Sequence, residues 1–532
     1  MAKTKVILPV LLLCVLCTAA SAREISWRRY SMDGSRDHSK GTALKEQKLL
    51  DSYAPRMAHL KRVVGTCPEP LTKRGAESTM GNWVADAFRS ELSIITGDKI
   101  DVVVYNFGGI RSDMPLGDVV EDDIRGMFPF KNSPCLVKIY GKRLIEIAGE
   151  LCRSPQAISG MEIVSRDRAL ESLKVDGKPV DPEAVYTLAT IDFLLTGGDG
   201  FFLGKDAIET KVANTLAFDV FMSHLKRLQD AGKPIAAVRD GRFRIEGDFM
   251  RKGHRDAAPA DMASGLPDGT VAENASRHRL TIVHTNDLHS QLEPMRSGRD
   301  AGKGGACEIA AFVDSLRKAD GRSNVLLLDA GDFEQGTSYF TLFGGETEIK
   351  SMNLLDYDAC TVGNHEWDNG DAALASRLRK ARCKCLLANY KWGNKDLDKV
   401  LEPYAIIRRG GLKIGLIGVL DDVSSLVAKN NVVSLEYESP EIAVNRWSTF
   451  LKKEKRCDVV IVLSHCGYST VQGPVGDIQM ASMIRDVDII IGGHSHTNLK
   501  APTYVKDLDG RDVMIVTDYC KGVYAGVIKI SD

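Results

Sequence analysis

Five apolar segments in the second half of the chain each end in aspartate, asparagine or histidine. They are LTIVHTND, NVLLLDAGD, ACTVGNHE, DVVIVLSHC and DIIIGGHSH, and helical patterns separate them. Apolar runs of this length predict buried strands, and strands that alternate with helices predict an α/β fold. Because ligands of open α/β sheets gather beyond the carboxyl ends of the strands, we expect these polar residues to converge.

The converging residues are candidate metal ligands. Asp287 and His289 are two positions apart, so on an extended chain their side chains point the same way. A single aspartate or histidine at a strand end is more often a cap or turn residue, but five such ends of one chemical type favour a metal centre. The seven candidate ligands are Asp287, His289, Asp332, Asn364, His465, His494 and His496.

These ligand types predict the kind of metal centre. Imidazole, carboxylate and amide oxygen together suit Zn, Mn, Fe or Co. Seven ligands exceed what one tetrahedral ion needs. We therefore expect two divalent metal ions (Zn, Mn or Co) bridged by one carboxylate, an arrangement that clamps the oxygens of a phosphoryl group in transfer.

Length, charge and the N-terminus limit the class of protein. The chain has 532 residues, which predicts at least two domains, and its 70 basic and 71 acidic residues argue against a nucleic-acid polymer as partner. Lys3 and Lys5 precede a short apolar run and the sequence Ala-Ser-Ala at 20–22. We interpret residues 1–22 as a secretory signal peptide cleaved near Ala22, and not as a membrane anchor, because the run is short for a span. This predicts export to the periplasm or the extracellular space.

A change of composition divides the chain into two halves. Residues 249–278 are rich in Gly, Ala, Asp and Pro and lack apolar periodicity, which predicts a linker. An α+β domain is predicted over residues 26–248. An α/β domain is predicted over residues 279–532, where the pattern fits a four-layer α/β/β/α sandwich.

The second-half motifs resemble a known family. NDLHS, GDFEQG, GNHEWD, LSHCG and GGHSHT resemble the calcineurin-like metallophosphoesterases and, more narrowly, the 5′-nucleotidase family. The resemblance implies that Asp287, His289 and Asp332 surround one ion, with His496 as a further ligand or a phosphate contact. It implies that the second ion is surrounded by Asp332, Asn364, His465 and His494.

The same resemblance implies the catalytic pair. His365 would stabilise charge on the transferring phosphoryl group or assist the leaving oxygen, and Asp368 would orient the imidazole of His365. A water activated by the ions would attack the phosphorus.

The first half resembles the substrate-binding domain of that family. The segments that carry the resemblance are RGAESTMGNWVADAF, YNFGGIRSDMPLGDV and FLLTGGDGF. The resemblance implies two aromatic rings around the base, phosphate and sugar contacts from basic and amide side chains, and a carboxylate on a ribose hydroxyl. These residues are, in that order, Phe130 and Phe193, then Arg74, Asn106 and Arg111, then Asp199.

In this chain the substrate-binding half precedes the metal-binding half, which reverses the usual order of the family. A circular permutation and a fusion of two separately encoded domains would both give this order. We expect an exported phosphohydrolase of nucleoside 5′-monophosphates. A 2′,3′-cyclic-nucleotide phosphodiesterase with 3′-nucleotidase activity, a UDP-sugar hydrolase and a non-catalytic periplasmic nucleotide-binding protein are the alternatives. Base preference, metal identity and oligomeric state are not readable from the sequence.

Overall fold

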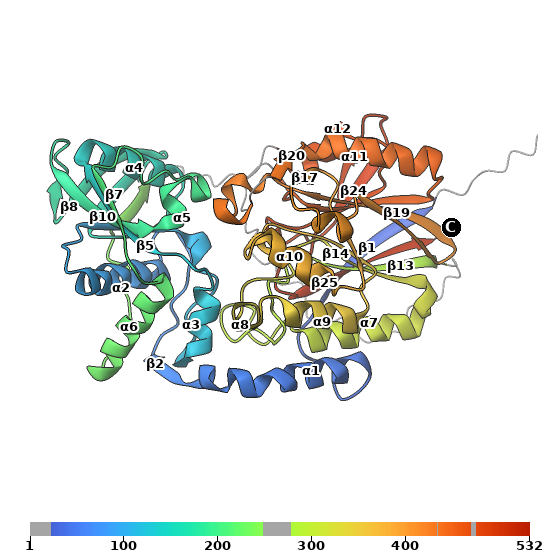
Figure 1. Ribbon diagram of the computed structural model, residues 1–532, viewed down its shortest axis with the longest axis horizontal. Helices are drawn as coiled ribbons and strands as arrows, with labels where there is room; N and C mark the ends of the chain where they lie inside the picture. Colours follow the sequence, from blue (N-terminus) through green and yellow to red (C-terminus); the bar gives the residue numbers. More distant parts are fainter. Residues whose placement is uncertain (1–22, 248–277, 433–434, 470–474, 532) are drawn as a thin grey trace, which may run out of the picture.

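The second half of the protein is built on two six-stranded sheets that pack face to face (Figure 1). The computed structural model describes residues 23–247, 278–432, 435–469 and 475–531. The first sheet contains, in spatial order, β1 (Glu24–Ser31), β25 (Tyr524–Ser531), β13 (His278–Thr285), β14 (Val325–Asp329), β15 (Ala359–Thr361) and β16 (Lys384–Leu386). The second contains β18 (Tyr404–Arg409), β19 (Leu412–Leu420), β21 (Val459–His465), β22 (Ile489–Gly492), β24 (Asp512–Val516) and β23 (Thr503–Lys506).

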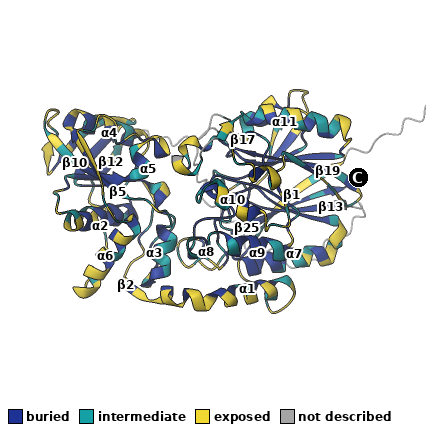
Figure 2. Ribbon diagram, in the orientation of Figure 1, coloured by how far each residue is buried: buried dark blue, intermediate teal, exposed yellow. Residues whose placement is uncertain are grey.

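Alternating side chains of the strands create the layers. On β13, Leu280 and Ile282 face the second sheet, whereas Val283 packs against the helices on the other side. The helices α7 (Ala306–Asp320) and α9 (Glu346–Leu355) cover the outer face of the first sheet, and α11 (Pro440–Thr449) and α12 (Asp477–Met483) cover that of the second. Figure 2 shows buried strands between helices with exposed outer faces. The predicted α/β/β/α sandwich is confirmed.

Two short helices and a small ribbon complete this half. The helices α8 (Ser338–Phe343) and α10 (Asp371–Leu378) follow the ends of β14 and β15. The strands β17 (Tyr390–Trp392) and β20 (Leu435–Tyr437) form an antiparallel pair of their own.

The first half is an α+β unit with its own hydrophobic core. Its main sheet runs β11 (Glu209–Val212), β5 (Pro134–Tyr140), β10 (Val185–Ile191), β3 (Val102–Tyr105) and β6 (Ala157–Ser159). Smaller sheets contain β12 (Phe243–Glu246), β7 (Met161–Arg166), β8 (Ala169–Val175) and β9 (Lys178–Pro179), and the pair β2 (Val63–Cys67) and β4 (Gly117–Val120). Its helices are α2 (Thr79–Thr96), α3 (Glu121–Met127), α4 (Gly141–Arg153), α5 (Asp192–Leu195) and α6 (Ala217–Asp230).

The N-terminal segment belongs to the second half, which differs from the predicted start of the first domain at residue 26. β1 forms an antiparallel ladder of eight residue pairs with β25, from Glu24↔Ser531 to Ser31↔Tyr524. Trp27 is buried in the core between the two sheets. Without β1, β25 would be an open edge of the sheet, and an unpaired edge strand is a liability. The pairing is non-local, so the sequence pattern alone did not reveal it.

The next helix also packs on the second half. α1 (Gly41–Met57) lies along α7 and α9 (Figure 1), and its residues Leu50, Tyr53 and Met57 share a small core with Leu292 and Tyr339. The chain crosses to the first half only after α1. The first-half fold is thus inserted between β1–α1 and β13 of the second. The two halves are therefore not arranged simply one after the other along the chain. The predicted signal peptide and linker lie outside the described residues.

The β1–β25 ladder makes a testable prediction about the chain path. Because Glu24 and Ser531 are Cα partners, a two-residue Asn-Gly turn can join them. A variant with this turn and with new termini between residues 247 and 278 should fold with the same circular dichroism spectrum and a similar melting temperature. A matched variant that opens the chain within β14 should not fold. Failure of the first variant to fold would contradict the pairing of β1 with β25.

Candidate active site

The polar residues at the strand ends converge at one edge of the sandwich. β13, β14 and β15 are parallel neighbours in the first sheet, and β21 and β22 are parallel neighbours in the second, so their carboxyl ends share an edge. Three groups of potential ligand atoms form there, and the atoms of each group lie within 4.8 Å of one another. The groups are Asp287–His289–His496, His289–Asp332–His365 and Asp332–His465–His494.

The first group lies at the end of β13. His289 and His496 face each other with 2.8 Å between their Nε2 atoms, and His496 Nε2 is 3.4 Å from Asp287 Oδ1. The backbone amide of His494 donates to the Asp287 carboxylate at 3.0 Å. The loop after β22 therefore fixes the orientation of the carboxylate at the end of β13.

The second and third groups share Asp332. Asp332 Oδ2 lies 3.0 Å from His465 Nε2 and 4.0 Å from His289 Nε2. His465 Nδ1 is 2.7 Å from the carbonyl oxygen of Ala330, to which it donates, and this bond directs Nε2 toward Asp332. Asp332 takes part in two of the three groups, which is the position that a bridging carboxylate requires.

The backbone around these ligands is strained. Asp287, His289, Asp332, His494 and His496 all have a positive φ, between 49° and 71°. This left-handed conformation is uncommon outside glycine and concentrates at functional sites. Five of the seven predicted ligands adopt it.

Close packing also restricts the sequence between the ligands. A Cβ atom at Gly363 would lie 2.2 Å from Asp332 Oδ1 and 2.7 Å from His465 Nε2. Only glycine lets the loop after β15 approach these two side chains so closely.

Burial and charge set the protonation of the cluster. Burial alone would raise the pKa of Asp332, but the imidazoles of His465 and His365 outweigh it and hold that pKa well below its usual range. Burial opposes charge on His465 as well, but Asp332 and Asp287 raise its pKa to about 10. Burial lowers the pKa of His494 to about 3, so its imidazole is neutral at pH 7.

The residues present fit divalent cations. Asn364 Oδ1 and His494 Nε2 are buried atoms without a hydrogen-bond partner. Buried polar atoms without partners are costly, and a cation beside Asp332 would satisfy both. An amide oxygen, imidazoles and a charged carboxylate that meet at one place form the donor set of a Zn, Mn or Co site.

The predicted catalytic pair is assembled beside the ligands. His365 Nδ1 lies 2.9 Å from Asp368 Oδ2, and the backbone amide of His365 donates to Asp332 Oδ1 at 2.9 Å. Burial lowers the pKa of His365, but Asp368 and Asp332 outweigh it and raise that pKa above its ordinary value. The carboxylate of Asp368 thus holds the ring and favours its protonated form.

Two residues of the first half face the metal-ligand groups. Arg111 Nη2 lies 3.1 Å from His289 Nε2. The ring centroid of Phe130 lies 5.8 Å from that of His365, and the Arg111 guanidinium is 6.0 Å from the Phe130 ring. The two halves therefore bring a guanidinium and an aromatic face to the edge of the ligand cluster.

The other predicted substrate contacts lie in the first half. Asn106 donates from Nδ2 to Asp199 Oδ2 at 2.7 Å, and its buried Oδ1 has no hydrogen-bond partner. Phe193 is half-buried on α5, next to the turn that carries Asp199. Arg74 is exposed, and within the described ranges its side chain has no recorded contact with another predicted site residue.

Three residues at the site were not predicted from the sequence. Lys73, next to Arg74, donates to the carbonyl oxygen of Ile110, and burial lowers its pKa to about 7. Lys521 donates from Nζ to the Arg111 carbonyl at 3.0 Å and from its backbone amide to the Asp287 carbonyl at 2.7 Å. It therefore joins the two halves directly.

Glu366, the third of these residues, connects the loops after β14 and β15. Its Oε2 accepts from the backbone amide of Asp332 at 3.0 Å, and its Oε1 accepts from that of Glu334 at 2.9 Å. It lies inside the GNHE motif, beside Asn364 and His365. That position was the only sequence signal that could have revealed it.

A chain of polar contacts links β1 to the metal-ligand loop. Trp27 Nε1 donates to His284 Nε2 at 3.0 Å, and His284 Nδ1 lies 2.7 Å from Asp518 Oδ2. The Asp518 backbone amide donates to Asn286 Oδ1 at 2.9 Å, and Asn286 Nδ2 donates to Asp287 Oδ2 at 2.6 Å. Apart from Trp27, which is 9% exposed, the residues of this chain are almost fully buried.

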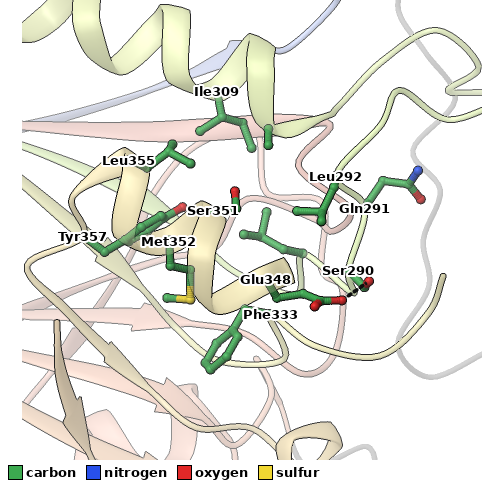
Figure 3. A pocket seen from close by; sticks show the side chains of 12 residues that line it. Ser290, Gln291, Leu292, Ile309, Phe333, Glu348, Ser351, Met352, Leu355 and Tyr357 are labelled. Carbon is green, nitrogen blue, oxygen red and sulfur yellow. Dashed lines mark hydrogen bonds between the residues drawn. The ribbon is translucent and has the colours of Figure 1, made fainter. Parts of the chain in front are cut away.

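A small cavity lies behind the same loop (Figure 3). It has a volume of about 20 Å³ and is lined by apolar side chains such as Leu355 and Met352, together with Ser290 and Glu348. The Ser290 hydroxyl donates to Glu348, and burial raises the pKa of Glu348 to about 7. The cavity has room for about one water molecule and none for a nucleotide.

Comparisons with known proteins match the two halves separately. Residues 280–498 match the family model described as calcineurin-like phosphoesterase, and residues 58–205 match that of the 5′-nucleotidase C-terminal domain. Human 5′-nucleotidase is 33% identical over 298 residues, which cover 51% of this chain and 50% of the relative. Snake venom 5′-nucleotidase of Gloydius brevicauda is 34% identical over 284 residues, with 48% and 46% covered.

The structural comparison has a similar extent. A solved 5′-nucleotidase precursor from Thermus thermophilus shares 33% identity over 47% of this chain and 50% of that chain, with a TM-score of 0.42. The chain spans about half the length of the curated relatives it matches.

The second half is thus a calcineurin-like phosphoesterase domain. The first half matches the domain described as the 5′-nucleotidase C-terminal domain, so the domain that is called C-terminal comes first here. The expected reversal of the domain order is confirmed.

The chain of contacts from β1 predicts an effect of a distant residue on metal binding. Trp27→Phe keeps an aromatic ring at this position and removes the hydrogen bond to His284. It should weaken the binding of Mn²⁺ by up to about 10-fold, because outer partners orient metal ligands. Titration calorimetry measures this. Trp392→Phe is a matched control, since its indole donates to Asp398 in a different part of the fold. Equal Mn²⁺ affinity of the two variants would contradict the link.

Proposed function

We propose that this protein hydrolyses nucleoside 5′-monophosphates to a nucleoside and phosphate. The phosphate would lie at the Asp–His cluster, and the base would lie between Phe130 and Phe193. The observation that carries the proposal is that Arg111 and Phe130 of the first half lie against His289 and His365 of the second. A phosphate with an aromatic group attached would contact both halves at once.

The ligands are proposed to hold two divalent cations. One position would be formed by Asp287, His289 and Asp332 with His496, and the other by Asp332, Asn364, His465 and His494. When bound, such ions neutralise phosphate charge and activate a water for in-line attack. The three overlapping ligand groups, with Asp332 shared, support this assignment.

The protein's own side chains would bind and orient the substrate. The planar Arg111 guanidinium suits bidentate contact with phosphate oxygens, and it lies 3.1 Å from His289. His365, held by Asp368 at 2.9 Å, would donate a proton or a hydrogen bond to the phosphoryl group or the leaving oxygen. Closure of the first half over the cluster would exclude bulk water and strengthen these contacts.

The nucleoside part would be bound by the first half alone. Flat aromatic faces at Phe130 and Phe193 hold any base, with about 1–3 kcal/mol per stacked base. Asn106 and Asp199, joined by a 2.7 Å hydrogen bond, offer an acceptor pair to ribose hydroxyls. The exposed Arg74 would add positive charge to the substrate-binding half. The preference for one base over another would be weak, because stacking contacts the ring faces and not the hydrogen-bonding groups at the base edges.

Export is a further part of the proposal. It depends on the N-terminal segment, which lies outside the described residues. In the part of the chain that the structure describes, no helix combines the length and the apolar character needed to cross a membrane. N-terminal sequencing of the mature protein would test cleavage near Ala22.

Two substitutions test the function, because one should remove only turnover and the other should remove both bound metal and turnover. With Mn, Co or Zn supplied, the wild type should release phosphate from AMP faster than from 3′-AMP, 2′,3′-cyclic AMP or UDP-glucose. His365→Ala should keep its metal content and lose about 100-fold or more in kcat. Asp332→Ala should lose both metal and turnover.

Exposed His59 provides a matched control, because His59→Ala should change neither quantity. Binding of AMP without phosphate release by the metal-loaded wild type would favour a binding protein. Preference for the cyclic or 3′ substrates would favour the sibling activity. If His365→Ala retained its kcat within about twofold, the role given to His365 would be wrong.

A further inference from the structure

Three cysteines gather on the outer side of the first sheet, away from the phosphoesterase cluster. Cys360 is the middle residue of β15 and Cys385 is the middle residue of β16, and the two are direct Cα partners in the parallel ladder. Cys383 lies two positions before Cys385, so both point to the same face of the sheet. All three pack in the core between this sheet and its helices.

The three sulfur atoms form a compact triangle. Cys360 Sγ lies 3.8 Å from Cys383 Sγ and 3.7 Å from Cys385 Sγ, and all three sulfurs lie within 4.8 Å of one another. A point equidistant from three such sulfurs lies roughly 2.3 Å from each, which is about the length of a metal–thiolate bond. Cys360 and Cys385 are buried, whereas Cys383 is half-buried and leaves a path from solvent.

The ligand set determines the class of ion. Thiolates are soft ligands that select Cu(I), Zn and iron–sulfur clusters. A structural zinc site needs four ligands, and the group found among the described residues contains three cysteines and no histidine or carboxylate. A three-coordinate soft monovalent ion matches this set best.

We propose that Cys360, Cys383 and Cys385 form a binding site for Cu(I). Each thiol that coordinates the ion releases its proton to solvent, and no oxidant or reductant is consumed. The ion would join β15 to β16. Because β15 leads directly into the loop with Asn364 and His365, the site lies behind the phosphoesterase centre without sharing a ligand with it.

The test is a competition for Cu(I) under anaerobic conditions. The full chain, saturated with Mn²⁺, receives Cu(I) as its acetonitrile complex and is then titrated with the chelator bathocuproine disulfonate. The wild type should retain one Cu(I) per chain and melt at a higher temperature with copper than without it. The Cu(I) affinity of Cys383→Ser should be lower by at least about 10–100-fold. Loss of a residue that only supports a metal ligand has an effect of that size, and Cys383 would itself be a ligand.

Two controls make the result specific. Cys457→Ser removes a buried cysteine of the same half that is outside the cluster, and it should retain the copper. Cys385→Ser should lose it, and circular dichroism reports whether each variant folds. Any Cu(I) bound by the histidines of the phosphoesterase centre would be bound equally by the wild type and by Cys383→Ser. It would therefore not contribute to the difference between the two. The proposal is overturned if wild type and Cys383→Ser bind Cu(I) equally, or if thiol titration of protein purified without reductant finds two of the three cysteines joined in a disulfide.

Discussion

The carboxylate of Asp332 is the group on which the rest of the site depends. It lies 3.0 Å from His465 Nε2, accepts the backbone amide of His365, and takes part in two overlapping ligand groups. A buried carboxylate without such partners would be too costly to keep charged. The left-handed backbone at Asp332, the hydrogen bond from its backbone N–H to Glu366 and the close approach of Gly363 all hold the carboxylate at this point. The strain is the cost of directing ligands from two sheets to one place.

The N-terminal strand extends this support to the far edge of the sheet. β1 presents Trp27 to His284, and through Asp518 and Asn286 it reaches Asp287. Arg29, two positions further, stacks 3.8 Å above the Tyr524 ring and donates to Asn498 in the loop that carries His496. Removing the residues before the first-half fold would therefore affect both the sheet edge and the ligand loops.

The sequence predicted what depends on local pattern. The convergence of the seven ligand candidates follows from the ends of five apolar strands, and the four-layer sandwich follows from the alternation of strands and helices. Partners distant in sequence could not be predicted. The ladder between β1 and β25 joins residues about 500 positions apart, and EISWRRYS carries no signal for the sheet it enters. The cysteine cluster likewise needs the register of β15 against β16. Lys73 and Lys521 donate hydrogen bonds to backbone carbonyl oxygens. Every residue has such an oxygen, so these contacts produce no sequence motif.

In the proposed function, one substrate spans the two halves, with its phosphate at the Asp–His cluster and its base on Phe130. The most direct measurement compares Phe130→Ala on AMP and on p-nitrophenyl phosphate, with exposed Phe202→Ala as a matched control. Loss of one stacking face should raise KM for AMP by about 5–150-fold, corresponding to about 1–3 kcal/mol, and leave the small ester almost unaffected. Unchanged KM for AMP, or equal losses on both substrates, would contradict a site shared between the halves.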